Sequence, residues 1–344
     1  MAIVAVAASG GIDSLCAALL IKKAGHDVIA LHGLFSTPAD APAELKVQCA
    51  AMAIPLVSVD LRSEFKRAVI AGFESGRKAG LTPNPCASCN REIKFGALAE
   101  AARKLGADLF ATGHYANLAR LADGNLAIAP AADSAKDQGY FLGLVPAHAL
   151  ENVLFPLAGQ LKSETRAMIA QAGLPAVKGG ESQDICFQPE ASAGHCGPVL
   201  LCEDILPDGS FGQLRQIGEH SGLAGFTIGQ RKGLRIPWSA PLHVLAKDGE
   251  RNALLVMGRP PAMRGCEIDS LNFFAPYASW PRQLYARMRY RQEPCGVTAS
   301  LTDNGVSLRL HKPAFPTAPG QLAAIYDANG LMLAGGIVRS ITCC

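Results

Sequence analysis

The chain has 344 residues, of which 49% are hydrophobic and 18% charged, and its formal net charge is +3. This length predicts two or three domains with a substantial apolar core, and so small a net charge excludes a protein-wide field that attracts polyanions. No run approaches the ~18 to 20 apolar residues of a membrane span, and the sequence from Met1 lacks a basic leader, so we expect a cytoplasmic protein without membrane contact.

The first strand, turn and helix predict a phosphate-binding site. Residues 2–8 are an unbroken run of small apolar residues, typical of a strand buried on both faces. The turn at residues 9–14 reads Ser-Gly-Gly-Ile-Asp-Ser and leads into a helical pattern that ends near Lys23. Free backbone N–H groups and the positive end of the helix dipole meet at such a turn. The turn lacks the lysine of a Walker loop, and an ordinary turn capped by Asp13 or Ser14 is the alternative.

Alternating strand and helix patterns through the first half of the chain predict a doubly wound parallel sheet. The expected elements are strands at residues 28–31 and 55–59, a strand from residue 109 into the turn at 113–114, and helices at 44–53, 65–80 and 162–172. Ligands of such sheets bind beyond the carboxyl ends of the strands, where Gly33, Gly113 and His114 are expected. Capping the turn or filling space is the alternative role for His114.

Three of the eleven cysteines have surroundings that suggest chemistry. Because a cytoplasmic protein keeps its thiols reduced, a metal site, a catalytic thiol and plain burial are the candidate roles. Cys86 and Cys89 form a C-x-x-C motif between the rigid Thr-Pro-Asn-Pro segment at 82–85 and a helix that resumes near Asn90, so we expect the helix dipole to lower their thiol pKa values. A redox pair, half of a metal site and coincidence are the alternatives. Cys186 is a third thiol far along the chain, for which burial as a small apolar residue is the alternative.

Beyond Pro189 the content of glycine and proline rises and helical periodicity fades. Residues 243–246 and 253–257 predict a hairpin. Apolar and polar residues alternate over 284–291, which predicts a half-buried strand whose open face carries three arginines. An RNA contact and a solvated face are the two interpretations of that face.

The last part of the chain is predicted to be an antiparallel β domain, a small barrel. Asn-Gly pairs at residues 304–305 and 329–330 are typical of hairpin turns between short strands. From Arg264 to the end there are eight Lys/Arg and five Asp/Glu, so the whole basic excess lies here. Such an excess is compatible with RNA binding without requiring it.

Taken together, segments along almost the whole chain resemble the bacterial and organellar tRNA-specific 2-thiouridylases. Each segment alone is a weak sign, whereas their order and spacing are specific. The matching segments lie at residues 9–14, 82–85, 89–90, 92–95, 106–108, 111–115, 136–138, 140–141, 185–187, 229–234, 289–292, 319–321 and 335–336.

The resemblance implies an ATP pyrophosphatase-loop domain of the adenine nucleotide alpha hydrolase type over residues 1–190, a small central domain over 191–263, and a tRNA-contacting β-barrel over 264–344. It also implies ATP and Mg²⁺, and the replacement by sulfur of the 2-oxo group of the wobble uridine, position 34 of tRNA. Adenylation turns that poor leaving group into AMP and releases pyrophosphate. The implied partners are tRNA and a sulfur donor, either a relay protein or sulfide, and we expect a monomer.

The resemblance also assigns roles to single residues. Cys186 corresponds to a cysteine that carries a persulfide, and Cys89 to one that assists release of the sulfur or closes a disulfide. The implied ATP-binding residues are Ala7, Ala8, Ser9, Gly10, Gly11, Ile12, Asp13, Ser14, Gly33 and Gly113. The residues implied to contact tRNA, the first three near a flipped base, are Asn84, Pro85, Cys86, His114, Lys136, Asp137, Gln138, Arg289, Tyr290 and Gln321.

The sequence departs from the family at the candidate thiol site. Cys86 stands where the family usually has aspartate, and Ser182, Gln183 and Asp184 stand where it has Ser-Thr-Gly. Other tRNA thiolases on this scaffold use three cysteines to hold a [4Fe–4S] cluster, and thiolate ligands suit iron–sulfur clusters or zinc. We hypothesise that Cys86, Cys89 and Cys186 bind a [4Fe–4S] cluster; a persulfide on Cys186 and a structural zinc are the alternatives.

Two other functions compete with tRNA thiolation. An adenylating ligase acting on a small acid shares the loop but predicts neither three cysteines nor a basic β domain. A non-catalytic tRNA-binding or sulfur-trafficking relative is opposed by the intact loop at 9–14 and by Cys186. The terminal Cys343 and Cys344 form either a metal or sulfur relay or a frayed tail.

Overall fold

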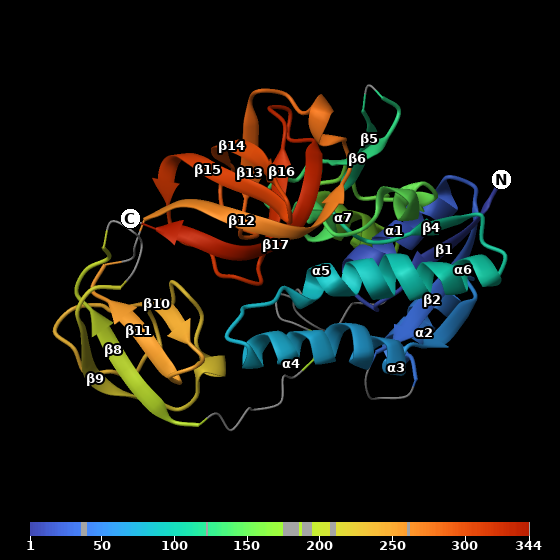
Figure 1. Cartoon of the computed structure of the whole chain (residues 1–344). Helices are drawn as coiled ribbons and strands as arrows, with labels where there is room; N and C mark the ends of the chain where they lie inside the picture. Colours follow the sequence, from blue (N-terminus) through green and yellow to red (C-terminus); the bar gives the residue numbers. More distant parts are fainter. Residues whose placement is uncertain are drawn as a thin grey trace.

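The computed structural model describes residues 1–35, 40–121, 123–174, 186–187, 195–206, 211–259 and 262–343. Figure 1 shows three parts: a parallel sheet with helices, a small central sheet, and a barrel. The predicted α/β fold with a central domain and a C-terminal antiparallel barrel is therefore confirmed. The substituted triplet Ser182, Gln183 and Asp184, and also Cys344, lie outside the described residues.

The first part is built on a five-stranded parallel sheet with the order β3-β2-β1-β4-β7. Its strands are β1 (Ile3–Ala7), β2 (Asp27–Leu34), β3 (Leu56–Asp60), β4 (Leu109–Ala111) and β7 (Val153–Leu154). Strand β1 is central, and its side chains alternate between two cores. Val4 and Val6 pack toward one face and Ala5 toward the other, which explains the unbroken apolar run.

Helices cover both faces of this sheet. The core on the Val4 and Val6 face is completed by α1 (Ile12–Lys23), α2 (Ala43–Ala51) and α7 (Lys162–Gln171). Two helical runs cover the other face, where Phe65 and Ile93 are fully buried. The first run joins α3 (Arg62–Phe65), a π-helical segment (Lys66–Ile70) and α4 (Ala71–Lys78); the second joins α5 (Pro85–Cys89), a π-helical segment (Asn90–Leu98) and α6 (Ala99–Lys104).

The two helical runs differ from the sequence expectation in their details. The helix predicted for residues 65–80 begins at Arg62 and contains a π-helical segment, which periodicity alone does not reveal. Helix α5 begins at Pro85, five residues before the start near Asn90 that the sequence predicts, because Asn84 Oδ1 accepts the N–H of Ala87 at 3.2 Å and Pro85 occupies the first helical position. The cysteine motif thus lies within one turn of a capped helix start.

Short elements lie between β4 and β7 of the first part. They are a hairpin of β5 (Asn117–Arg120) and β6 (Leu126–Ala129) and two 3₁₀ segments (Gly139–Leu142 and Ala147–Leu150). The central sheet has the order β10-β11-β8-β9. Its strands are β8 (Gly197–Cys202), β9 (Leu214–His220), β10 (His243–Asp248) and β11 (Ala253–Met257), with a 3₁₀ segment (Leu223–Gly225) after β9. The predicted hairpin of β10 and β11 is confirmed.

The C-terminal part is a closed barrel with the order β12-β15-β14-β13-β16-β17. Its strands are β12 (Met263–Phe273), β13 (Leu284–Arg287), β14 (Cys295–Thr302), β15 (Gly305–Ala314), β16 (Leu322–Tyr326) and β17 (Met332–Cys343), with a 3₁₀ segment (Tyr277–Ser279) after β12. Hairpins at both Asn-Gly pairs are confirmed.

The predicted arginine strand over residues 284–291 is wrong in its second half. Strand β13 ends at Arg287, and a turn follows in which the N–H of Met288 donates to Gln292 Oε1 at 2.9 Å. Arg289 then packs over the ring of Phe315 at 5.0 Å instead of lying on an open strand face. The alternation of apolar and polar residues continues to residue 291, although the hydrogen-bonded strand ends at Arg287.

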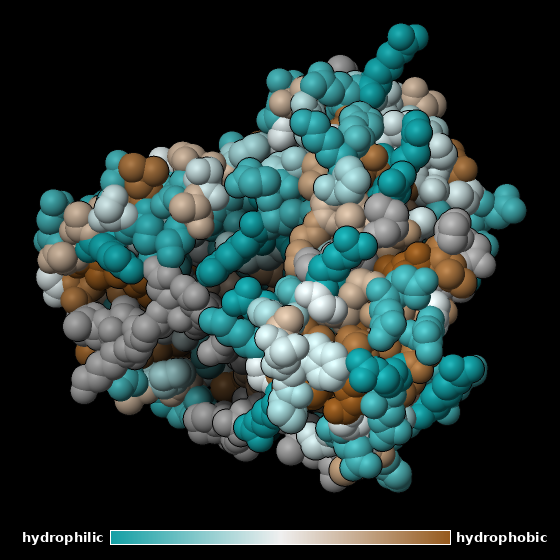
Figure 2. Space-filling model, turned by 90° about the vertical axis from the view of Figure 1, so that its left-hand side faces the viewer, coloured by the Kyte–Doolittle hydropathy of each residue, from teal (hydrophilic) through white to brown (hydrophobic). Residues whose placement is uncertain are grey.

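One face of the molecule is shown as a space-filling view in Figure 2. On the face shown in Figure 2, hydrophilic side chains cover most of the area and apolar residues gather in several smaller patches. None of the helices in the described part of the chain is long and apolar enough to span a membrane.

Candidate active site

The turn after β1 has the geometry of a phosphate cradle. Gly10 adopts a φ of +84°, which residues with side chains rarely tolerate. Two hydroxyl groups hold the turn closed: Gly11 N–H donates to Ser9 Oγ at 3.2 Å, and Ser14 Oγ donates to Gly11 O at 2.9 Å. Among the described residues no side chain caps α1, which argues against the capped-turn alternative. The first turn of α1 can therefore offer its N–H groups to an anion.

The other predicted ATP residues surround this turn. A Cβ atom on Gly113 would lie 2.7 Å from the backbone of Asp13 and Ser14, so only glycine lets the turn after β4 come this close to the cradle. Gly33 lies near the end of β2, opposite Val59 of β3. The remaining predicted residues are Ala7 at the end of β1, Ala8, whose N–H donates to Leu31 O at 2.9 Å, and Ile12 at the start of α1.

A buried lysine lies beside the cradle, and the sequence analysis missed it. Lys162 Nζ is 2.5 Å from Asp13 Oδ1, and its side chain is only 9% exposed. Its ammonium group also lies 5.6 Å from the centre of the Tyr115 ring. The Tyr115 hydroxyl donates to Thr165 Oγ1 at 2.8 Å, which fixes the ring. Lys162 thus supplies the positive charge that a phosphate site needs and that residues 9–14 lack.

The sequence contains one indication that Lys162 could bind phosphate, but that indication is not sufficient alone. It is the first residue of α7, and the sequence predicted that helix correctly. Nothing in local periodicity shows that α7 packs against α1, which is the contact that brings Lys162 to Asp13. A sequence that lacks a lysine inside its phosphate loop is a reason to search helix starts elsewhere for one.

The structure brings the three predicted thiols into one neighbourhood. Cys86 and Cys89 lie one turn apart on α5, the first exposed and the second buried. Cys186 is exposed, and its charged form raises the pKa of both Cys86 and Cys89, so the three sulfur atoms are close enough to interact electrostatically. No set of three metal-binding side chains within the described ranges is gathered tightly enough for a single ion.

The expected lowering of the thiol pKa values is wrong. Burial is the largest influence: it raises the pKa of Cys86 and raises that of Cys89 to about 12. Cys86 is exposed as a residue, yet the protein around its sulfur atom still disfavours the thiolate. The dipole of a helix start does not overcome this burial, and Asn84 already engages one of its N–H groups.

A lysine on the same helical run opposes the effect of burial. The charge of Lys94 lowers the pKa of Cys86 and of Cys89. Its Nζ lies 3.4 Å from His114 Nε2. Because an ammonium group can only donate, Nε2 must accept, and the ring proton is on Nδ1, which donates to Thr112 Oγ1 at 2.7 Å. Lys94 is thereby held next to the thiols.

His114 is a neutral group in this arrangement. Burial, followed by the charge of Lys94, lowers the pKa of His114 well below its usual value. Its ring packs against Phe95 and Phe155, with centroids 5.8 and 6.3 Å apart. Both ring nitrogens are engaged by protein groups, so space filling alone does not describe His114.

Several residues predicted to contact tRNA make contacts within the protein. The Oδ2 and Oδ1 atoms of Asp137 accept the N–H groups of Ala131 at 2.7 Å and Gly139 at 3.1 Å. Gln138 Oε1 accepts the N–H of Tyr115 at 3.1 Å. These side chains hold the segment that follows β6, and Lys136 precedes them as a half-buried residue.

The predicted barrel residues meet the first domain near the thiol helix. Gln321 Nε2 donates to Thr82 O at 2.7 Å, four residues before Cys86. Arg289 Nη2 donates to Ile228 O at 3.1 Å. The ring of Tyr290 lies 4.4 Å from that of Phe141, whose carbonyl oxygen accepts a hydrogen bond from Asn90 at 3.0 Å. Gln321 and Tyr290 thus lie near α5, whereas Arg289 contacts the central domain.

Comparison with protein families gives three matches in chain order. A family described as tRNA methyl transferase HUP domain matches residues 2–190, and one described as tRNA methyl transferase PRC-barrel domain matches residues 208–258. An aminomethyltransferase beta-barrel domain family matches residues 263–338. The matches follow the three parts seen in Figure 1.

Individual proteins similar to this chain are described as tRNA-specific 2-thiouridylase MnmA. One from Nitratidesulfovibrio vulgaris (strain DSM 19637 / Miyazaki F) is 40% identical over 97% of this chain and 98% of that protein. One from Oleidesulfovibrio alaskensis is 42% identical over 98% of this chain and 99% of that protein. One from Chloroflexus aurantiacus is 37% identical with the same coverage.

Proposed function

The chain belongs to the tRNA-specific 2-thiouridylase family, and we propose that it uses ATP to replace the 2-oxo group of the wobble uridine of tRNA by sulfur. The main support for this function is that one domain contains both a phosphate cradle with Lys162 and a group of three thiols. Transfer of a methyl group, which two of the family descriptions name, needs neither feature. An ATP-driven exchange of oxygen for sulfur needs both.

The first half of the reaction activates the uracil oxygen. The 2-oxo oxygen attacks the α-phosphorus of ATP, the bond to the β-phosphate oxygen breaks, and pyrophosphate leaves. The N–H groups at the start of α1 and the ammonium group of Lys162 are placed to balance the charge of the leaving pyrophosphate. Asp13 is the carboxylate at the cradle to which a Mg²⁺ ion can bind.

The second half replaces AMP by sulfur. In the persulfide form of the reaction, the outer sulfur on Cys186 attacks C2, and the C2–O bond breaks as AMP leaves. The Cys89 thiolate then attacks the Cys186 sulfur, a Cys89–Cys186 disulfide forms, and the electron pair of the broken S–S bond stays on the tRNA sulfur. A dithiol reductant resets the pair. Because burial raises the pKa of Cys89 to about 12, the positive charge of Lys94 is needed for this step.

A [4Fe–4S] cluster on Cys86, Cys89 and Cys186 is our proposal for the sulfur-carrying group. Three sulfur donors that interact electrostatically suit an iron–sulfur cluster. The described thiols are not close enough together to bind a single metal ion, but a cluster is larger than one ion. The chemistry that such a group supplies is one open iron position for the transferred sulfur. Lys94 offsets the negative charge of three thiolates, and their deprotonation on binding makes the affinity pH-dependent.

We further propose that residues 1–190 carry the chemistry, while residues 191–263 and 264–344 form the central domain and the barrel that hold the tRNA. The family matches that end at 190, span 208–258 and begin at 263 support this division. Contacts of Gln321 and Tyr290 near α5 support a role of the barrel in presenting the RNA to the thiols.

Pyrophosphate release and thiouridine formation test the function together. Unmodified tRNA transcripts with uridine at the wobble position are incubated with the protein, ATP, Mg²⁺ and sulfide, before and after anaerobic reconstitution with iron and sulfide. We expect pyrophosphate release that depends on tRNA, and a thiolated nucleoside in the digested RNA.

Each part of the proposal has its own contradicting result. Pyrophosphate release with no tRNA requirement would indicate a ligase for a small acid, and no release with any tRNA would leave a binding protein. If the reconstituted wild-type protein shows the visible absorption of a cluster and Cys86→Ala does not, the result supports the three-cysteine site. Full activity of Cys86→Ala, together with no such absorption in the wild type, would leave the persulfide reaction.

A further inference from the structure

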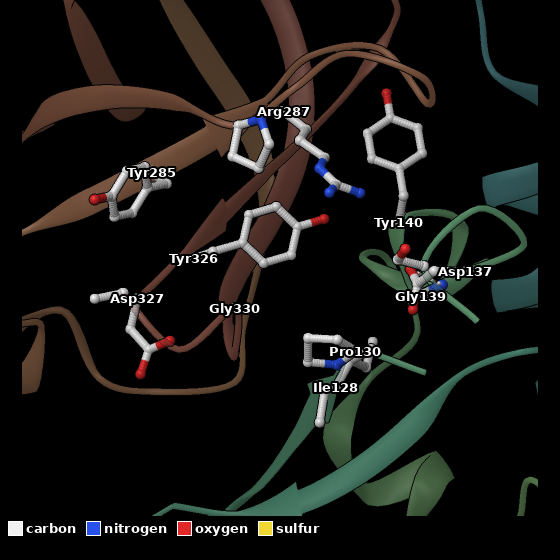
Figure 3. Close-up of a pocket in the computed structure, with 14 residues that line it drawn as sticks. Ile128, Pro130, Asp137, Gly139, Tyr140, Tyr285, Arg287, Tyr326, Asp327 and Gly330 are labelled. Atoms are coloured by element: carbon white, nitrogen blue, oxygen red, sulfur yellow. Dashed lines mark hydrogen bonds between the residues drawn. The ribbon is translucent and has the colours of Figure 1, made fainter. Parts of the chain in front are cut away.

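A cavity of about 340 Å³ lies between the barrel and the segment that follows β6. This volume falls in the range of small-ligand pockets. Figure 3 shows its two walls: Tyr285, Arg287 and Tyr326 come from the barrel, and Asp137 and Gly139 from the first domain. The cavity is separate from both the cradle and the thiols.

Arg287 is the unusual member of this cavity. Its Nε atom is buried and has no hydrogen-bond partner in the structure. Within the described residues its guanidinium group forms no hydrogen bond or ion pair; it lies 5.8 Å from the centroid of the Tyr326 ring, and its charge is close enough to Asp137 to lower the pKa of that carboxyl. A guanidinium group has five N–H donors in a fixed plane, and leaving the buried Nε–H without an acceptor is costly. The guanidinium group of Arg287 can therefore donate hydrogen bonds to a planar ligand that carries acceptor atoms.

The opposite wall offers acceptors. Each carboxylate oxygen of Asp137 takes one backbone N–H, from Ala131 or Gly139, which leaves a further lone pair on each oxygen. Asp327 is a second carboxylate in the lining. With two carboxylates against one arginine, a phosphate or other multiply charged anion would be repelled. The ligand must carry acceptors on one edge and donors on another, with little net charge.

We propose that this cavity binds a guanine base, with its O6 and N7 atoms toward Arg287 and its N1–H and N2 amino groups toward Asp137. Arginine pairs with O6 and N7 of guanine through two parallel hydrogen bonds. The tyrosine rings that line the walls supply faces and edges for the flat base, as in proteins that hold unstacked RNA bases. Adenine presents a donor where Arg287 requires an acceptor, and the pyrimidines lack the N7 edge.

The source of the guanine rests on the proposed function. If the protein acts on tRNA, an unstacked guanine of the same RNA can enter the cavity while the wobble base is at the thiols. A free guanine nucleoside has the same base and is the other source. Binding measurements separate the two, and they need no catalytic turnover.

The experiment removes one acceptor atom from the ligand and one donor group from the protein. Transcripts are made with 7-deazaguanosine in place of guanosine, which keeps base pairing but deletes N7. Binding to wild-type protein is expected to weaken roughly tenfold, the effect of one hydrogen bond to a charged group. Arg287→Met keeps an apolar stem on Tyr326 and should bind both transcripts equally, and more weakly than wild-type protein binds the deaza transcript, because it loses the bonds to both O6 and N7.

Arg282→Met is the matched control, because Arg282 is an exposed arginine of the same barrel outside the cavity. It should retain the tenfold difference between transcripts. Guanosine titrated against tyrosine fluorescence, with adenosine as its control, reports free nucleoside binding. A response to guanosine that Arg287→Met abolishes, with no effect of deaza substitution in RNA, assigns the cavity to the free nucleoside.

Two results would overturn the inference. One is a loss of affinity for the deaza transcript that is equally large in wild-type protein and Arg287→Met; the other is no discrimination against deazaguanine or adenosine in either assay. Failure of thiouridine formation alone would leave the cavity assignment standing, since binding is measured without ATP. The cavity and the proposed reaction can therefore fail separately.

Discussion

The phosphate cradle and the thiol site lie in the same domain but depend on different parts of the chain. The cradle consists of residues 9–14, Gly113 and Lys162, all within the first domain. The thiol helix α5 starts where the other two parts dock. The barrel contacts Thr82 through Gln321, and the central domain contacts Leu81 through Lys247, whose Nζ donates to Leu81 O at 3.2 Å.

This difference separates the two halves of the reaction physically. A turn fixed by its own hydroxyl groups and glycines can bind phosphates whatever the later domains do. A helix whose preceding segment is held by two other domains keeps its thiols correctly placed only when all three parts are docked. Substitutions at the cradle should therefore affect ATP chemistry alone, and substitutions at the docking points should affect sulfur transfer first.

The largest effect is expected from Lys162→Met. Loss of the buried ammonium group beside Asp13 removes the countercharge for pyrophosphate, and release should fall roughly a hundredfold, as when a fixed charge-stabilising group is removed. Alkylation of Cys86 should not change. Quenched-flow assay of pyrophosphate and mass spectrometry of alkylated peptides measure the two effects.

Lys104→Met is the control for Lys162→Met, since Lys104 forms an exposed ion pair with Glu100 whose side chains are 74% and 57% exposed. The double variant Asp13→Asn with Lys162→Met removes the unpaired carboxylate and should recover stability without recovering activity. Normal pyrophosphate release by Lys162→Met would mean that the cradle needs no lysine.

A tenfold effect on the thiol half is expected from Lys94→Met. Burial raises the pKa of Cys86 and Lys94 opposes it, so removing the charge raises this pKa further. The thiolate is the reactive form, so a higher pKa lowers the thiolate fraction at any pH below it, and the alkylation rate should fall roughly tenfold. Alkylation of Cys86 by iodoacetamide at pH 8 measures this.

Lys94→Arg keeps the positive charge and should retain most of the alkylation rate. Pyrophosphate release in the Lys94 variants should stay near the wild-type value, because the cradle does not contact Lys94 in the described structure. Equal alkylation rates for Lys94→Met and wild type would show that another charge controls the thiols.

The same contrast explains which parts were predictable from sequence. The cradle and β1 were predicted because each rests on contiguous residues with a local cause, such as the glycines at 10–11, whereas the helix start was placed near Asn90 because the cap at Asn84 was overlooked. Lys162 and the raised pKa of Cys89 were not predicted, since both arise from packing between distant segments. The end of β13 at Arg287 also depends on its barrel neighbours.

A severalfold effect on sulfur transfer is expected from Gln321→Glu. The amide Nε2 donates to Thr82 O, and a carboxylate of the same shape has no proton to donate there at neutral pH. The barrel should then hold the segment before α5 less firmly. The ratio of thiouridine formed to pyrophosphate released, at saturating tRNA, should fall roughly threefold to tenfold. Gln283→Glu, on the exposed barrel surface, is the control, and an unchanged ratio in Gln321→Glu would contradict barrel control of the thiol helix.

The smallest effect is expected at the other docking point, Lys247. Burial, with a further contribution from Arg77, lowers the pKa of Lys247 to about 8 in the folded protein. The unfolded chain keeps this proton up to its ordinary pKa of about 10.4. The folded state therefore gains stability from this group as the pH rises from 7 to 9, by up to about 1 kcal/mol for a partly buried group.

Urea unfolding of wild-type protein and Lys247→Met at pH 7, 8 and 9 measures this contribution as a difference in slope. The variant should lack the gain, while Lys232→Met, an exposed lysine of the same domain, should keep it. Since Lys247 also donates to Phe226 O at 3.1 Å, it ties the central domain to the first at Leu81. Parallel slopes would mean that docking at Leu81 does not bury this charge, and the thiol helix would then depend on the barrel contact at Thr82 alone.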